Sequence, residues 1–178
     1  MTARAAAVAA SAFLSLAAAS AQEALTIEDF VRQAAEDNRA DAEIGGMVRN
    51  DPALPQGVHR VGEAVAGTAR RLDGPLADLA QSHQVRLGSG LGEQDRQMIQ
   101  QLSRIQGDEF TRDYLQFVIN DLERDIKLYQ DAAGIGSTAV GRFVEETLPA
   151  LRANLALARR VWDEQTAQAP EEQGSSPE

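Results

Sequence analysis

Apolar residues recur at steps of three, four and seven along most of the chain, a spacing typical of amphipathic helices. The most regular run predicts a helix that begins after Pro55 and ends near His83. Its apolar positions are Val58, Val61, Val65, Leu72, Leu76 and Leu79. The same spacing predicts helices over residues 26–49, 93–105 and 109–133, and a last helix from about residue 137. We expect 93–105 and 109–133 to be two pieces of one helix, broken and capped at Gly107-Asp108.

Local signals indicate where these helices begin, bend and end. Thr26 can cap the first helix because Asp29 follows three residues later, and Leu25 can pack on Phe30. Gly134 is expected to take the left-handed conformation that ends the third helix. Prolines inside the second and last helices, at positions 75 and 149, are expected to kink them.

Composition favours helices over sheets. Hydrophobic residues make up 43% of the chain, yet aromatic residues make up only 4%, and alanine is abundant. Short side chains suit closely packed helices better than a sheet sandwich rich in valine and tyrosine. Four long helices joined by short or glycine-rich turns, the longest at residues 87–93, predict an all-α fold, an antiparallel up-down four-helix bundle.

Charge and cysteine content exclude several classes of function. The formal net charge of −10 argues against nucleic acid, whose phosphates need a basic surface, and against anionic lipid. The chain has no cysteine, so disulfides, thiolate nucleophiles and cysteine-based zinc sites are excluded.

The two ends predict export and a tail. Residues 1–21 carry an early cation, an alanine- and leucine-rich run and a small-residue cleavage pattern that ends at Ala21, as in a secretory signal peptide. Cleavage there would leave a periplasmic protein without a membrane span. Residues 22–167 would form the bundle domain, and 168–178 an acidic, disordered tail.

Candidate chemistry is sparse and centres on two carboxylates. Asp121 and Asp125 are four residues apart and share one helical face, where like charges in an exposed helix cost about 0.2–0.5 kcal/mol. They indicate either a hard-cation site or a solvated face. The second interpretation, in which Arg124 pairs with Asp121 and Lys127 with Glu123, is the one we adopt.

The two histidines offer no metal or catalytic motif. The Glu-x-x-His motif of carboxylate-bridged bundle metal sites is absent, since Gln56 precedes His59 and Ala80 precedes His83 at that spacing. No serine, histidine and acid grouping is present either. We therefore predict no catalytic residue, no cofactor and no histidine-ligated metal.

Three stretches resemble a known family. They are FVRQAAEDNRADAEIG (30–45), GDEFTRDYLQFVINDLERDIKLYQDAAG (107–134) and ETLPALRANLALARRV (146–161). From about residue 30 to 161 the chain resembles the bacterial envelope proteins grouped as domain of unknown function 4142. This resemblance implies an exported, ferritin-like helical bundle.

The resemblance also shows where this chain departs from the family. Family members carry histidines at three positions that here hold Ala69, Leu122 and Asn154. Glu43 matches a family glutamate. The replacement of a histidine layer implies a bundle without a working metal centre, in which Asp121 has lost its partners.

Three hypotheses on function follow. The first is a non-catalytic periplasmic bundle that binds another envelope component or serves in stress tolerance. The second is a metal-binding or redox bundle that uses Glu43, Asp121 and Asp125 as weak candidate ligands. The third is a carrier of a small apolar ligand, with a cavity near Ala69 and the two proline kinks. The sequence identifies neither the partner nor the oligomeric state.

Overall fold

The computed structural model describes residues 24–168, and they form helices and connecting loops without a strand. The helices are α1 (Ile27–Met47), α2 (Gln56–Ser82), α3 (Glu93–Leu102), α4 (Gly107–Ala132), the short 3-10 helix η1 (Ala133–Ile135) and α5 (Thr138–Gln168). The all-α prediction is confirmed. The predicted signal peptide and most of the predicted tail lie outside the described residues.

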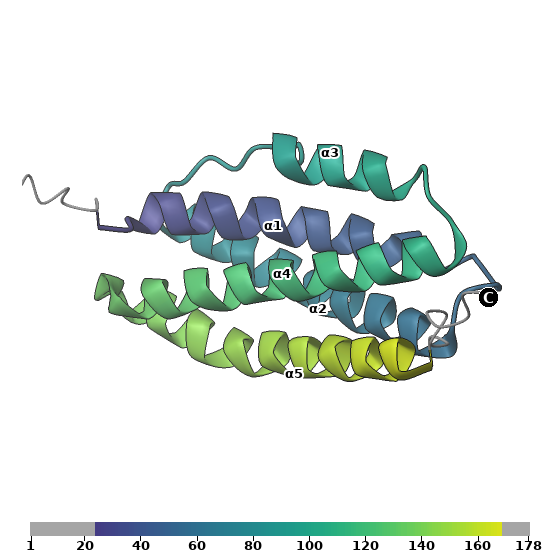
Figure 1. The fold of residues 1–178 in the computed structure, drawn as a ribbon. Helices are drawn as coiled ribbons and strands as arrows, with labels where there is room; N and C mark the ends of the chain where they lie inside the picture. The colour runs from purple at the N-terminus through teal and green to yellow at the C-terminus, as the bar shows by residue number, and fades with distance from the viewer. Residues whose placement is uncertain (1–23, 169–178) are drawn as a thin grey trace, which may run out of the picture.

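The four long helices lie side by side, and α3 lies outside them (Figure 1). The most extensive packing joins α1 to α2 and α4 to α5, while α2 also packs on α5 and α1 on α4. The short α3 contacts α1 and α4, and Figure 1 shows it alongside α1. The sequence predicted α3 as the first piece of a broken helix. In the structure it is a separate helix, and residues 103–106 connect it to α4.

The predicted start of α1 is confirmed. Thr26 is the N-cap residue, and its hydroxyl oxygen accepts a hydrogen bond from the backbone N–H of Asp29 at 3.1 Å. Leu25 packs against the core that contains Phe30. The first turn is therefore fixed by both a polar and an apolar contact, as the sequence indicated.

Two other local predictions are wrong in detail. The left-handed residue after α4 is Gly136, with φ +82°, and not Gly134, because one turn of 3-10 helix extends the end of α4. At the start of α4, Asp108 does not cap the helix. Gln106 is the N-cap residue, and Gly107 takes φ +63°.

The helices α1 and α2 approach each other closely at Gly45 and Gly62. A Cβ atom added to Gly45 would lie 2.6 Å from the Gly62 carbonyl oxygen and 2.7 Å from the Ala66 nitrogen. Only glycine permits backbones this close. Near the other end of α1, the core holds an aromatic cluster in which the rings of Phe30 and Tyr129 meet edge to face at 5.3 Å between centroids.

Both internal prolines lie within continuous helices and on the solvent side. Pro75 is exposed in α2 and Pro149 is exposed in α5. A proline leaves the carbonyl one turn earlier without its helical donor, and an exposed position lets water replace that donor. Among residues 24–168, no helix combines the length and hydropathy that a membrane crossing requires.

Candidate functional site

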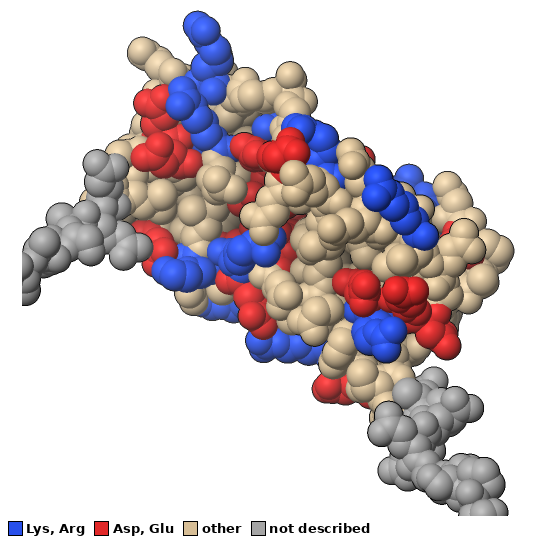
Figure 2. Space-filling model, turned by 45° about the horizontal axis from the view of Figure 1, so that its top comes forward, with Lys and Arg blue, Asp and Glu red and all other residues tan. Residues whose placement is uncertain are grey.

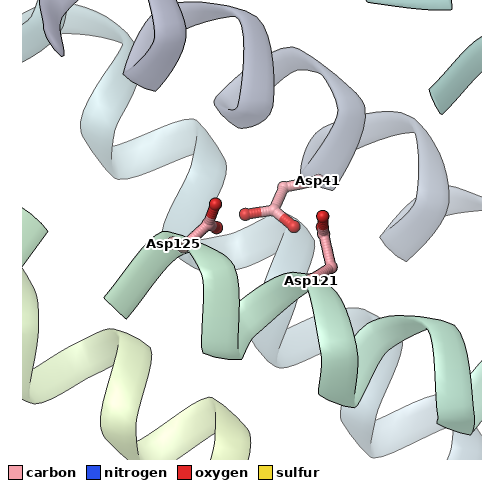
Figure 3. Close-up of side chains that lie close together, drawn as sticks. All are labelled: Asp41, Asp121 and Asp125. Atoms are coloured by element: carbon pink, nitrogen blue, oxygen red, sulfur yellow. The ribbon is translucent and has the colours of Figure 1, made fainter. Parts of the chain in front are cut away.

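Three aspartates from two helices converge in the core (Figure 3). Asp41 comes from α1, and Asp121 and Asp125 come from successive turns of α4. One carboxylate oxygen from each lies within 4.8 Å of the other two. Their exposed fractions are 6%, 5% and 4%, so all three belong to the interior. We call these three residues the aspartate cluster.

The cluster corrects our interpretation of Asp121 and Asp125 as part of a solvated face. The predicted ion pair between Arg124 and Asp121 is present, but the Asp121 carboxylate itself is buried. The predicted pair of Lys127 with Glu123 is wrong. Lys127 pairs with Asp131 on its own helix, and Glu123 accepts a bond from Arg159 of α5 at 2.6 Å.

Burial and mutual repulsion disfavour the charged forms of the cluster. Desolvation is the largest cause that raises the pKa of Asp41 well above 3.8, and the charges of Asp125 and Asp121 add to it. Desolvation and the Asp121 charge likewise raise the pKa of Asp125 well above its usual value. For Asp121, desolvation raises the pKa while the Arg124 guanidinium opposes the shift. Fully ionised, the cluster would therefore be strongly destabilising.

One guanidinium cannot balance three carboxylates. Arg124 is the only basic side chain that forms an ion pair with the cluster within residues 24–168. Three negative charges and one positive charge leave a net charge of −2 in the interior. Either protons or a divalent cation can neutralise that remainder.

Two further buried polar atoms flank the cluster without a hydrogen-bond partner in the described chain. The first is Oδ1 of Asn38, one helical turn before Asp41 on α1. The second is the Tyr114 hydroxyl on α4, which lies near enough to Asp41 for that charge to add to the effect of burial in raising the Tyr114 pKa. Buried polar groups are usually paired, so both indicate room for a water molecule or an ion.

Two more aspartates lie at the outer edge of the cluster. Burial raises the pKa of Asp37 on α1 to about 7, and the charges of Asp121 and Asp95 add to the rise. A hydrogen bond from Gln33 at 2.8 Å acts in the opposite direction and lowers this pKa. Asp95 on α3 is partly buried, which raises its pKa, while Arg124 lowers it. The acidic region thus extends from the seam of α1 and α4 to the underside of α3.

The other candidate residues lie apart from the aspartate cluster or serve as packing. Glu43 is exposed on α1 and is not one of the three aspartates that meet. Ala69 and Leu122 are fully buried. Asn154 on α5 donates to the Thr68 hydroxyl at 3.0 Å and to the Ala64 carbonyl at 3.4 Å.

A layer of amide hydrogen bonds crosses the bundle at Ala69 and Asn154, two of the three positions where the family resemblance implied a replaced histidine. The Asn38 side-chain nitrogen donates to the Ala69 carbonyl at 3.1 Å and to Asp73 at 2.7 Å, which joins α1 to α2. The Asn154 bond to Thr68 joins α2 to α5. In this chain that layer is part of the packing between helices.

Comparison with known proteins supports the family resemblance. The model of the domain of unknown function DUF4142 matches residues 13–161. The chain belongs to the DUF4142 family. No curated protein and no solved structure matched the chain.

Proposed function

We propose that this DUF4142 protein is an exported, non-catalytic binding bundle that holds one hard divalent cation at the aspartate cluster. The observation that carries the proposal is the convergence of three buried carboxylates on one point between α1 and α4. Oxygen ligands of this type favour Ca²⁺, Mg²⁺ or Mn²⁺. A divalent cation would offset the net charge of −2 that remains after the Arg124 ion pair.

The spacing of the oxygens suits an ion of the size of Ca²⁺. Ligands on opposite sides of Ca²⁺ are about 4.6–5.2 Å apart, twice the usual calcium–oxygen distance. The three carboxylate oxygens lie within 4.8 Å of one another, so one ion can contact all of them. The buried, unpartnered oxygens of Asn38 and Tyr114 support the presence of ordered water in this part of the core.

The distribution of exposed charges supports an interior location for the cation site. On the face that Figure 2 presents, acidic and basic side chains alternate, and neither sign covers a broad area. Within residues 24–168, only Asp121 of the aspartate cluster forms an ion pair, with Arg124, and Asp41 and Asp125 form none. Because Ca²⁺ and Mg²⁺ do not change oxidation state, we favour a structural or storage role for the ion.

The proposal also includes export to the periplasm and an antiparallel arrangement of the four long helices. The pattern of residues 1–21 supports secretion to the periplasm with cleavage after Ala21. The side-by-side packing of four long helices supports the antiparallel, ferritin-like arrangement that the family resemblance implies. The mass of the protein recovered from a periplasmic fraction tests export and the position of cleavage. A mature chain that begins at Gln22 is expected, and an uncleaved chain in the cytoplasm would contradict export.

Calcium titration calorimetry of the chelator-treated protein tests the site. The wild type should bind one Ca²⁺ per chain, and Asp125→Asn should lose at least ten-fold in affinity. Glu43→Gln is the matched control, since Glu43 is exposed on α1 and should leave binding unchanged. Calcium affinity that depends on Glu43 and not on Asp125 would contradict the proposal.

A further inference from the structure

The helix α3 differs from the other helices in how loosely it is packed. Of its ten residues, only Leu102, at its last position, is buried. Three apolar neighbours, Leu91, Met98 and Ile99, rest partly buried against the core. Segments with few buried contacts open locally at a lower free-energy cost than the core does. The packing therefore predicts that α3 separates from the bundle more easily than α1 or α4.

Glycines flank α3 on both sides. Gly88 and Gly90 precede it, and a Cβ atom added at either would meet nothing within 4 Å. Gly107 follows it with φ +63°, a conformation that other residues rarely adopt. These positions allow large changes in backbone angles on either side of a short rigid helix.

Side chains of α1 contact the N-terminus of α3 and the loop that precedes it. Arg39 donates to the Gly90 carbonyl at 3.1 Å, and Arg32 donates to the Arg86 carbonyl at 3.4 Å. A Cβ atom added to Gly92 would lie 2.5 Å from the Glu36 carboxylate, so Glu36 rests against the N-terminus of α3. These contacts are polar and exposed, and each contributes little to stability.

The acidic region that contains the aspartate cluster lies next to α3. The helix contacts both α1 and α4, between which the aspartate cluster is buried. Asp95 of α3 is partly buried, and its charge adds to the effect of burial in raising the pKa of Asp37, Asp121 and Asp125. Arg124 acts on both Asp95 and Asp121 and so links the helix to the cluster.

We propose that α3 is a hinged cover of the aspartate cluster, which opens to admit the cation and closes over it with Asp95 as an additional, outer carboxylate. This inference rests on the proposed cation site. A bound cation attracts Asp95 and favours the closed state, whereas the empty, ionised cluster repels it.

Hydrogen exchange of the purified protein tests the hinge. In the metal-free protein, α3 amides should exchange at least ten-fold faster than the buried amides of α4, at a rate that low denaturant leaves unchanged. If closing is coupled to the ion, Ca²⁺ at 100 times its Kd should slow α3 exchange by up to about 100-fold. Exchange of α3 only by global unfolding, at the rate of α4, would overturn the proposal whether or not Ca²⁺ binds.

A reversible crosslink tests the route of entry. The chain has no cysteine, so Glu36→Cys combined with Gly92→Cys would form the single disulfide between α1 and the start of α3. The oxidised protein should bind Ca²⁺ at least ten-fold more slowly than the reduced protein. The single variant Glu36→Cys is the control for loss of the carboxylate.

The outcomes separate the two proposals. Equal binding rates in the oxidised and reduced proteins, with the disulfide verified by mass, would overturn the cover and leave the cation site intact. Wild-type protein that binds no Ca²⁺ under either condition would overturn the cation site, and with it the role of α3 in admitting an ion. Fast α3 exchange in that case would still establish the hinge itself.

Discussion

The metal-free protein should lose stability as pH rises from about 4 to about 7. Burial raises the pKa of Asp37 from 3.8 to about 7 in the folded chain. The folded state therefore holds this proton more tightly than the unfolded state does. Stability is full below the unfolded pKa and falls as pH rises through the folded pKa.

The size of this effect follows from the shift. A difference of about three pKa units corresponds to about 4 kcal/mol, since each unit is worth about 1.4 kcal/mol. Partial exposure of Asp37 lets solvent screen the charge, so about 2 to 4 kcal/mol is the expected loss. The raised pKa values of Asp41 and Asp125 act in the same direction.

Urea unfolding in the presence of chelator, at pH 4, 5, 6, 7 and 8, measures this loss. The free energy of unfolding should decrease across that range, and saturating Ca²⁺ should flatten the decrease. Asp37→Asn should be less sensitive to pH and more stable than the wild type at pH 8. A metal-free protein whose stability increases between pH 4 and 7 would refute the reasoning.

Two further predictions concern packing. Gly45→Ala should destabilise the fold by about 1–3 kcal/mol, because its Cβ atom would lie 2.6 Å from the Gly62 carbonyl oxygen. Gly46→Ala is the matched control, since nothing lies within 4 Å of its added Cβ atom, and should be neutral or stabilising by up to about 1 kcal/mol. Asn154→Ala should cost about 0.5–1.5 kcal/mol, because the buried Thr68 hydroxyl loses one of its two donors and keeps the other, Arg71. Thermal and urea unfolding measure all three, and a Gly45→Ala protein as stable as its control would contradict the packing account.

The helices were predictable because their signals are local. The cap at Thr26 needs only the next three residues, and the apolar spacing of α2 is visible within seven. The errors at Gly134 and Asp108 are also local, since one extra turn of 3-10 helix or one residue's conformation shifts an end. Such shifts of one or two residues are small on the scale of a helix.

The aspartate cluster was not predictable in the same way. Asp41 lies 80 residues before Asp121, and their contact depends on which helices become neighbours and how each is rotated. A usable signal was present in α1, where Asn38 and Asp41 fall on the same stripe as the buried apolar residues. Acids on the inner stripes of two helices indicate a shared site more strongly than a pair on one helix does.

The most direct test of the central claim is anomalous diffraction from crystals of the protein grown with Mn²⁺. We expect one strong peak between α1 and α4, within about 2.3 Å of carboxylate oxygens from Asp41, Asp121 and Asp125. The peak should be lost in Asp125→Asn crystals. An ordered cluster that lacks this peak in the wild type at saturating Mn²⁺, its carboxyl groups joined by hydrogen bonds, would contradict the account.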